Sequence, residues 1–331
     1  MDRKVIIVCG GDHGRGMGHV FRMRVLAGAI STMLECTVTF LIDPETVVDP
    51  LARDPLINEV LCLPSDALAC RCRAIETKCP ALVIADIYDI AVEEAEIYKH
   101  EQSKLIIFDN TGPATSIADC VVNAIVGGVQ NSCYMQGGTL FCVGPRYMIM
   151  HPDYRKMRPR YPTTGDSVGR IAVALGGADA LDLTETVAEW LVALDYEVTL
   201  VKGPASNLDS GPVWTHHKVT KITSPDNLAR VLSSCDLAVT GGGVSAYEAA
   251  CLGVPAVIIP QAPHEVLTAR RLSDCGSALV IGSPIRRNEF TEAVGMLARD
   301  RDRRRMMAWS GFRLLDGDIT PVVDVVRQLI D

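Results

Sequence analysis

The chain has 331 residues, of which 48% are hydrophobic and 22% charged, and its formal net charge is −8. Its length suits two domains, because single cores stop growing at about 250–300 residues. The negative charge argues against nucleic acid as the main partner, since phosphate binding requires basic stripes. The sequence contains no apolar run of about 18 residues that could span a membrane, and its N-terminus does not resemble a signal peptide. We therefore expect a cytosolic protein.

Short apolar runs alternate with helical patterns along the first half of the chain. Residues 5–9 are predicted to form a strand, 10–18 a glycine-rich loop and 20–34 a helix with one apolar face. Further strands are predicted at 37–42, 59–63, 81–85, 104–108 and 119–124, with helical patterns near 65–78 and 91–102. Continuously apolar strands joined by helices indicate a parallel sheet that is covered on both faces.

The pattern lapses between residues 144 and 169, where four prolines and mixed charges indicate an interdomain linker. It then restarts, with strands predicted at 171–175, 197–202, 237–240, 256–260 and 278–281. Helices are predicted at 183–194, 226–234, 264–275 and from 288 onward, and Pro321 sets off a final helix at 322–330. The predicted domains are therefore 1–150 and 169–319, joined by a linker at 151–168.

The stretch from Asp236 to Pro260 is the strongest candidate for a binding site. Gly241-Gly242-Gly243 follows an apolar strand and leads directly into a helix that begins near Val244. Such a junction presents backbone N–H groups at a positive helix end and lets a ligand approach the backbone, which favours an anion such as a diphosphate. Glu248 falls within the first two turns, where its carboxylate can reach a ribose diol. The alternative is a tight turn without a ligand, with Glu248 as an ordinary surface residue.

Two Rossmann-like halves are expected to hold ligands at the carboxyl ends of their strands, in a cleft lined by three glycine-rich loops. The predicted diphosphate ligands in these loops are Gly18, Gly176, Gly177, Gly242, Gly243, Val244 and Ser245. None of the loops has the Lys-Ser or Lys-Thr of a P-loop, and the first lacks the third glycine of the dinucleotide fingerprint. ATPase and NAD-dependent activities are therefore disfavoured.

The segment Gly16-Met17-Gly18-His19-Val20-Phe21-Arg22 resembles the G-x-G-H-x-x-R motif of nucleotide-sugar enzymes with the GT-B fold. In motif order and length the chain resembles the UDP-sugar hydrolase of pseudaminic-acid biosynthesis and its spore-coat polysaccharide relatives. More distantly, it is similar to the peptidoglycan GlcNAc transferase. The other matching segments are Asp86-Ile87-Tyr88-Asp89, Phe108-Asp109-Asn110, Gly144-Pro145-Arg146-Tyr147, Ala174-Leu175-Gly176-Gly177, Gly241–Glu248 and Asp316-Gly317.

This resemblance implies an α/β protein of GT-B type, with two Rossmann-like domains and a final helix that crosses back onto the N-terminal domain. It implies a hydrolase of surface-glycan or nonulosonic-acid biosynthesis, which releases UDP from an N-acetylated deoxy sugar when water attacks the anomeric carbon. Two alternatives remain open. One is a metal-independent inverting glycosyltransferase, in which an acceptor hydroxyl replaces water. The other is a non-catalytic protein that binds a nucleotide sugar.

The resemblance also implies roles for individual residues. His19 would be the catalytic base, because a helix N-terminus favours the neutral imidazole that can deprotonate water. A capping or packing histidine is the alternative. Backbone N–H groups at the triple glycine would stabilise the leaving diphosphate in place of a metal ion. The predicted substrate contacts are His13, Arg22, Asp86, Tyr88, His264 and Glu265, and the last two replace an Asn-Gln pair of the family.

We expect neither a cofactor nor a metal ion. The twelve cysteines form no Cys-x-x-Cys pair, and the cluster Cys70, Cys72 and Cys79 fits no common zinc spacing. They are interpreted as reduced thiols that pack as small apolar residues. A metal site built from Asp12, His13 and His19 is the alternative, although a glycine-rich loop gives such ligands no supporting second shell. The Asp-x-Asp matches at 300–302 and 316–318 are interpreted as incidental.

Overall fold

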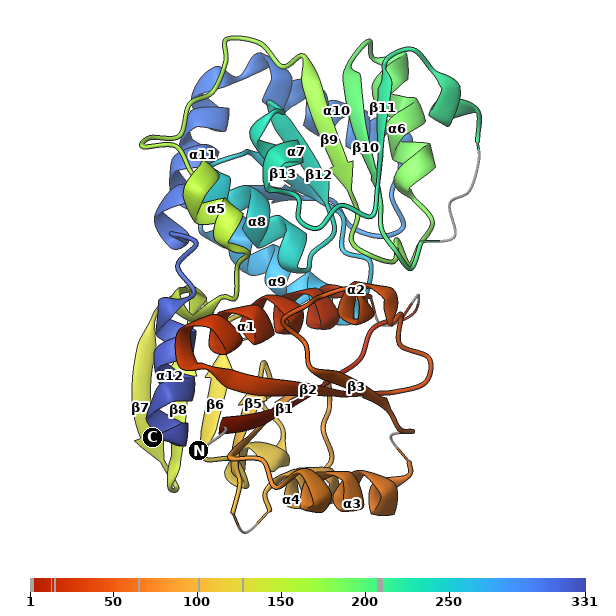
Figure 1. Ribbon diagram of the computed structural model, residues 1–331. Helices are drawn as coiled ribbons and strands as arrows, with labels where there is room; N and C mark the ends of the chain where they lie inside the picture. The colour runs from red at the N-terminus through yellow and green to blue at the C-terminus, as the bar shows by residue number, and fades with distance from the viewer. Residues whose placement is uncertain are drawn as a thin grey trace. The chain divides into compact units, whose positions relative to one another are not determined.

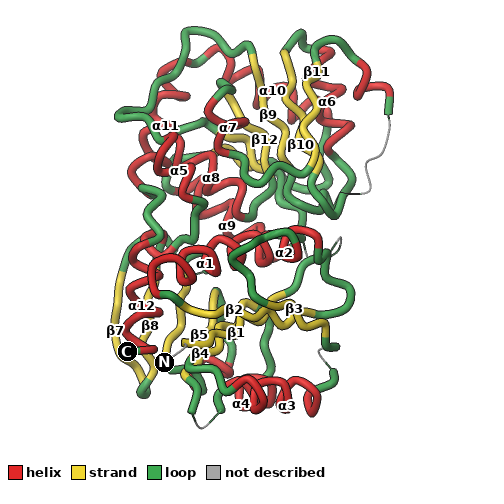
Figure 2. The backbone as a smooth tube through the Cα atoms, viewed as in Figure 1, coloured by secondary structure: helices red, strands yellow, loops and turns green. Residues whose placement is uncertain are grey.

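The computed structural model describes residues 3–12, 14, 16–64, 66–100, 102–126, 128–206 and 211–331. It divides into two compact units (Figure 1). The first unit comprises Met1–Asp12, His19–Met150 and Asp318–Asp331, and the second comprises His13–Gly18 and His151–Gly317. Each unit is built on its own sheet, and strands alternate with helices along most of both (Figure 2).

The sheet of the first unit has eight strands in the order β3-β2-β1-β4-β5-β6-β8-β7. Their bounds are β1 Arg3–Cys9, β2 Cys36–Ile42, β3 Glu59–Cys62, β4 Leu82–Asp86, β5 Lys104–Phe108, β6 Cys120–Asn123, β7 Ser132–Gln136 and β8 Thr139–Val143. The pairs are parallel, except that β7 runs antiparallel to β8. All of β4 and β6 is buried. This explains their continuously apolar sequences, because helices cover both faces of such a sheet.

The helices of this unit include one from the far end of the chain. They are α1 Gly18–Leu34, α2 Asp49–Ala52, α3 Leu68–Lys78, α4 Val92–Tyr98 and α12 Thr320–Ile330, with the 3-10 turns η1 Pro113–Ser116 and η2 Pro145–Tyr147. The α12 helix buries Val322, Val323 and Val326 and contacts η2. Arg3 forms an ion pair of 2.6 Å with Asp331, so the two chain ends lie together (Figure 1). The final helix is therefore part of the same core as the first strand.

The second unit has a parallel sheet of six strands in the order β11-β10-β9-β12-β13-β14. The strands are β9 Arg170–Ala174, β10 Glu197–Lys202, β11 Val219–Thr223, β12 Leu237–Thr240, β13 Ala256–Ile258 and β14 Ala278–Val280. The helices are α5 Pro152–Met157, α6 Thr184–Ala193, α7 Ala229–Ser233, α8 Val244–Leu252, α9 Pro263–Asp274, α10 Arg287–Arg299 and α11 Arg301–Leu314, with the 3-10 turn η3 Pro212–Thr215. Strand β12 lies between β9 and β13, so the turn that follows it starts from the middle of the sheet.

Two segments differ from the expectations. The β7–β8 hairpin was not predicted, because every residue of β7 is exposed and its apolar run is only three residues long. The segment 151–168, expected to be a linker, contains α5, whose Tyr154 is fully buried. Buried Arg304 also donates to the carbonyl oxygens of Gly165 and Asp166, so packing and hydrogen bonds hold this segment on the second unit.

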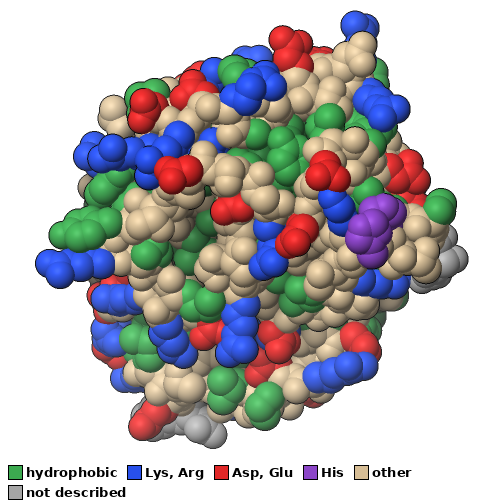
Figure 3. All heavy atoms as spheres, turned by 90° about the horizontal axis from the view of Figure 1, so that it is seen from above, with side chains coloured by type: hydrophobic (Ala, Val, Ile, Leu, Met, Phe, Trp, Pro, Cys, Tyr) green, Lys and Arg blue, Asp and Glu red, His purple; other side chains and the backbone are tan. Residues whose placement is uncertain are grey.

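None of the described helices combines the length and hydropathy that a membrane crossing requires. On the face shown in Figure 3, acidic and basic side chains are interspersed. This face therefore has no continuous basic stripe of the kind that follows a nucleic-acid backbone.

Candidate functional site

Four charged or titratable side chains meet in the first unit. His19 Nδ1 lies 2.7 Å from Asp86 Oδ1, and Arg22 Nε donates to Asp86 Oδ2 at 2.6 Å. The two Nη groups of Arg22 donate to Asp86 Oδ1 and to Asp109 Oδ2. Asp109 is itself held, because its Oδ1 accepts the backbone N–H of Ile125 at 2.7 Å. The four residues form one continuous chain of hydrogen bonds, which we call the His19 network.

The fold explains why these residues meet. His19 and Arg22 are three residues apart in the first turns of α1, so they lie on the same face of the helix. Asp86 is the last residue of β4, and Asp109 directly follows β5. These two strands are parallel neighbours, and their carboxyl ends therefore share one edge of the sheet. The two aspartates belong to motifs that the sequence analysis had singled out, but it had given Asp109 no role.

The electrostatics of the network favour a charged Asp86. Burial alone raises the pKa of Asp86, but Arg22 and His19 outweigh it and hold that pKa well below its ordinary value. Asp86 is 1% exposed and Arg22 4%, whereas the His19 side chain keeps 25% of its exposure. An ionised carboxylate at Nδ1 fixes the tautomer that carries the proton there, and this leaves the lone pair on Nε2. The arrangement presents His19 as a base.

Two predicted substrate contacts belong to the network. Arg22 and Asp86 are expected to bind substrate; in the structure both are buried, and their polar atoms pair with each other, with His19 and with Asp109. This arrangement suits them to position His19, and a direct substrate contact stays a prediction. Tyr88, two residues after β4, is 57% exposed, which is compatible with the predicted contact.

The triple-glycine turn of the second unit joins β12 to α8. Gly242 N donates to Glu265 Oε2 at 2.8 Å, and Gln261 N donates to the same oxygen at 2.7 Å. A Cβ at Gly242 would lie 2.7 Å from the carbonyl oxygen of Glu265, so only glycine fits there. Glu265, in the first turn of α9, therefore holds the turn. Because this N–H is bonded to Glu265 in the structure, a diphosphate contact of Gly242 stays a prediction.

Three other N–H groups remain at this turn. In the described part of the chain, the N–H groups of Gly243, Val244 and Ser245 meet no acceptor, and no side chain caps α8. Thr240, directly before the turn, is fully buried, and its Oγ1 has no hydrogen-bond partner among the described residues. Unpaired N–H groups at the positive end of a helix are suited to an anion.

The loop before α1 packs against this turn within the second unit. Buried Met17 fills the space beside Gly177, where a Cβ would lie 2.4 Å from Met17 Cβ. A Cβ at Gly18 would lie 3.5 Å from Val244 Cγ2. Gly176 has φ +98°, a left-handed conformation that glycine adopts without strain. Of the predicted glycines, Gly18 therefore lies beside the N-terminus of α8, and Gly177 lies beside the loop that precedes α1.

Glu248 on α8 is half-buried. Burial raises its pKa to about 7, and a hydrogen bond with Tyr154 opposes the rise. The Tyr154 hydroxyl also accepts the backbone N–H of Leu228 at 3.1 Å. At neutral pH, Glu248 is therefore divided between a form that donates and a form that only accepts. Either form can bond a hydroxyl, and the role of Tyr154 in this environment had no sequence signal.

Among the remaining candidates, His264 is exposed at the start of α9, and His13 lies outside the described residues. The metal site that would include His13 lies outside them as well. Among the described residues, no group of three or more His, Cys, Asp or Glu side chains is arranged to hold a metal ion.

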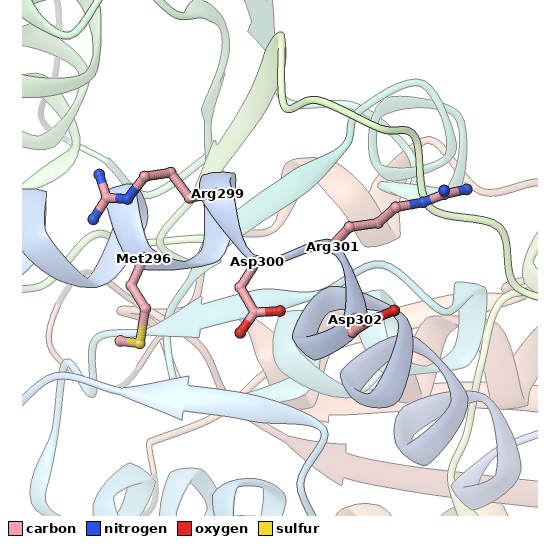
Figure 4. Close-up of a pocket in the computed structure, with 5 residues that line it drawn as sticks. All are labelled: Met296, Arg299, Asp300, Arg301 and Asp302. Carbon is pink, nitrogen blue, oxygen red and sulfur yellow. The ribbon is translucent and has the colours of Figure 1, made fainter.

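A surface hollow at the junction of α10 and α11 is lined by Met296, Arg299, Asp300, Arg301 and Asp302 (Figure 4). Asp300 accepts the Arg303 N–H at 2.8 Å as the cap of α11, and Arg301 pairs with Asp166. Asp300, the first aspartate of the 300–302 match, therefore has a structural role.

Comparisons with known proteins place these features in context. The chain is 30% identical over 291 residues to the spore coat polysaccharide biosynthesis protein SpsG of Bacillus subtilis (strain 168), an alignment that covers 83% of each chain. It is 29% identical over 274 residues to the uncharacterized protein MJ1062 of Methanocaldococcus jannaschii, covering 78% of this chain and 56% of that one. No family model matches the chain.

Solved structures share the fold over the whole chain. Acinetobacter baumannii MurG superimposes with a TM-score of 0.66 at 16% identity, covering 99% of this chain and 100% of that chain. The spinosyn rhamnosyltransferase SpnG in complex with thymidine diphosphate gives 0.70 at 14% identity, with the same coverage. These likenesses confirm the GT-B type of the two parallel-sheet units. The identity to SpsG confirms the resemblance inferred from the motifs, and the chain belongs to the SpsG family of spore coat polysaccharide biosynthesis proteins.

Proposed function

We propose that this protein is a nucleotide-sugar enzyme of polysaccharide biosynthesis that hydrolyses a UDP-sugar. The products are UDP and an N-acetylated deoxy sugar. The family relationship to SpsG supports the pathway, and the N-terminus of α8 supports a diphosphate ligand. The observation that carries the proposal is the 2.7 Å contact between His19 Nδ1 and Asp86 Oδ1, because it leaves Nε2 of a partly exposed imidazole ready to accept a proton.

The proposed reaction is a single displacement. The oxygen of water attacks the anomeric carbon while the bond from that carbon to the diphosphate oxygen breaks, so the configuration inverts. The proton of the water passes to His19 Nε2. The imidazolium that results is stabilised by the ionised Asp86, as in other carboxylate–histidine pairs. The leaving UDP gains negative charge, for which the N–H groups of Gly243, Val244 and Ser245 are suitable partners without a metal ion.

A glycosyltransferase is the second candidate, and a specific observation favours it. The solved structures that share the fold include the spinosyn rhamnosyltransferase and MurG. Such an enzyme needs the same base and the same diphosphate ligands, but an acceptor hydroxyl takes the place of water. The chemistry at His19 and at the turn is otherwise unchanged. A protein that binds the nucleotide sugar without turnover is the third candidate.

One experiment separates the three candidates. The purified full chain is incubated with a panel of UDP-sugars without an acceptor, UDP release is followed, and the first anomer formed is identified by NMR. Hydrolysis predicts UDP together with free sugar of inverted configuration. Release that begins only after an acceptor is added identifies a transferase. Binding without turnover identifies the third candidate, and no affinity for any UDP compound overturns the proposal.

The His19→Ala variant tests the base directly. We expect turnover to fall by about 100-fold or more, which is the usual contribution of general base catalysis, while UDP affinity stays within about twofold of the parent. His217→Ala, which changes an exposed histidine, is the matched control and should retain full activity. Full activity in His19→Ala would remove His19 from the mechanism.

A further inference from the structure

The β7–β8 hairpin of the first unit carries a pair of thiols outside the His19 network. Cys133 on β7 lies directly opposite Cys142 on β8, and their Sγ atoms are 3.7 Å apart. The hairpin closes through Gly137-Gly138, with Gln136 opposite Thr139. Both glycines have positive φ, as a tight two-residue hairpin turn requires. The two thiols therefore face each other on neighbouring strands of a well-defined ladder.

The position in the ladder suits a cross-link. In an antiparallel pair, hydrogen-bonded and non-hydrogen-bonded pairs alternate, and a two-residue turn closes on a hydrogen-bonded pair. Gln136 and Thr139 form the hydrogen-bonded pair at the turn, and Cys133 and Cys142 form the third pair beyond it. The two cysteines are therefore a non-hydrogen-bonded pair, whose Cα atoms lie about 4.5 Å apart. This separation lies at the short end of the range that disulfides bridge, about 4.4–6.8 Å. The backbone can therefore stay in place when the sulfurs join.

The two thiols differ in access. Cys133 is exposed on β7, which is the edge strand of the sheet, whereas Cys142 is 1% exposed. A small oxidant in solution therefore meets Cys133 first. Cys142 is held behind it, in position to react with whatever forms on the Cys133 sulfur.

The surroundings of Cys142 favour its thiolate, which is the reactive form of a cysteine. The thiol of Cys120 lowers the pKa of Cys142 most, burial opposes this, and Cys133 and the Tyr147 hydroxyl lower it further, so that it falls to about 7. The pKa of Cys133 is raised, by burial and by its interaction with the Cys142 sulfur. Near neutral pH the negative charge of the pair therefore lies mainly on the Cys142 sulfur, which is 3.7 Å from Cys133 Sγ and can accept the Cys133 proton. When that proton lies on Cys142, the exposed Cys133 sulfur carries the negative charge.

We propose that Cys133 and Cys142 form a reversible disulfide, which makes the β7–β8 hairpin a redox modification site whose co-reactant is a peroxide. The Cys133 thiolate attacks one oxygen of hydrogen peroxide; the O–O bond breaks, Cys133 becomes a sulfenic acid, and the departing hydroxide takes the Cys142 proton and leaves as water. The Cys142 thiolate then attacks Cys133 Sγ. The S–S bond forms, the S–O bond breaks, and the departing hydroxide takes a proton from solvent to become the second water. Two thiols are oxidised and one peroxide is reduced.

Cys79 shows what distinguishes this pair from an ordinary surface thiol. It is also exposed, but its thiol donates to the backbone carbonyl of Glu76 at 2.9 Å. Peroxide can convert such a thiol to a sulfenic acid, but within the described part of the chain no second sulfur lies within hydrogen-bonding distance to resolve it. Cys79 therefore serves as an internal control in the same molecule.

The test uses the full chain, reduced and freed of reductant, and treated with hydrogen peroxide before the remaining thiols are blocked with N-ethylmaleimide. We expect a loss of about 2 Da, reversed by dithiothreitol, since two thiol hydrogens leave in the disulfide. Cleavage of the chain after Met135 places Cys133 and Cys142 on different fragments, and these fragments then stay joined only if a disulfide connects them. Cys133→Ser changes an exposed side chain and should abolish the cross-link. Cys79→Ser should leave it unchanged.

Three outcomes would overturn the proposal. The first is a Cys133 that is oxidised to sulfinic acid without a cross-link. The second is a disulfide between Cys120 and Cys142 in place of the proposed one. The third is a cross-link that persists in Cys133→Ser. Because Cys133 lies on the surface, the Cys133→Ser variant is expected to fold. Its circular dichroism spectrum is recorded before the peroxide is added, to verify that it is folded.

Discussion

His19 Nδ1 and Asp86 Oδ1 are 2.7 Å apart, and Arg22 holds the Asp86 carboxylate from its other side. The network contains one arginine and two aspartates, so its fixed charges sum to about −1 beside the imidazole when all three are ionised. A proton accepted at Nε2 of His19 is therefore stabilised where it arrives. The same residues also connect α1 to the ends of β4 and β5, so the proposed catalytic role and the structural role overlap here.

The Asp86→Asn substitution should affect both the proposed catalytic role and the structural role. We expect turnover to fall by about 10³-fold, because the amide no longer fixes the imidazole tautomer or stabilises the imidazolium. Stability should fall by about 3–5 kcal/mol, since buried Arg22 loses a charged partner. Single-turnover kinetics and urea unfolding measure the two effects. Asp89→Asn, at an exposed position three residues later, is the control, and an equal loss there would contradict the assignment.

Glu265 can be tested by comparing two substitutions. Glu265→Gln keeps an oxygen that accepts the N–H groups of Gly242 and Gln261, and it removes a negative charge from beside the turn. We expect UDP affinity to be retained or increased. Glu265→Ala leaves both N–H groups without that acceptor, at a cost of about 1–3 kcal/mol in stability, with weaker UDP binding. Isothermal titration and thermal unfolding measure these effects, and weaker UDP binding in the Gln variant than in the Ala variant would refute this account.

Gly242→Ala tests the close approach at the turn. The new Cβ would lie 2.7 Å from the Glu265 carbonyl oxygen, so the turn or the start of α9 must shift. We expect UDP affinity to fall by at least tenfold. Gly282→Ala is the matched control, because a Cβ there meets no atom within 4 Å. Equal UDP affinity in both variants would show that the turn tolerates the change.

Glu248→Gln should alter the pH dependence of stability. The folded-state pKa of Glu248 is raised from 4.5 to about 7, so the folded state binds the proton more tightly than the unfolded state. Stability therefore declines as pH rises from about 4.5 through 7, by up to about 3 kcal/mol. Gln cannot ionise, so the stability of the variant relative to the parent should be higher at pH 8, and the two stabilities should be equal near pH 4. Urea midpoints measured across this range test the prediction, and a constant difference would contradict it.

Buried elements were the most predictable part of the fold. Strands β4, β9 and β12 lie inside parallel sheets, so their burial on both faces appears in the sequence as unbroken apolar runs. Strand β7 gave no such signal, because it lies at an exposed edge and is held by its pairing with β8. An apolar pattern in the sequence reveals side chains that are buried. It does not reveal an exposed strand that is held in place by pairing with a neighbouring strand.

The candidate site was predictable as motifs but not as contacts. The glycines and His19 carry local signatures, since a strand, a turn and a helix N-terminus follow one another in the chain. The pairing of Arg22 with Asp86 joins residues that are 64 positions apart, and Gly242 and Glu265 are 23 apart. Nothing local shows that Arg22 is buried. The internal hydrogen bonds of Arg22, Asp86 and Gly242 could therefore not be predicted from the sequence.

Neither compact unit is a continuous piece of the chain. Asp318–Asp331 belongs with the first unit, and α12 buries a row of valines there. A fragment that stops at Met150 would expose the apolar surface that these valines cover, and a nonsense mutation shortly before codon 318 would destabilise a domain encoded more than 150 codons upstream. Expressing the first unit alone therefore requires the codons of residues 318–331 to be spliced onto it. In the cell, that unit completes its core only after the ribosome has passed through both units.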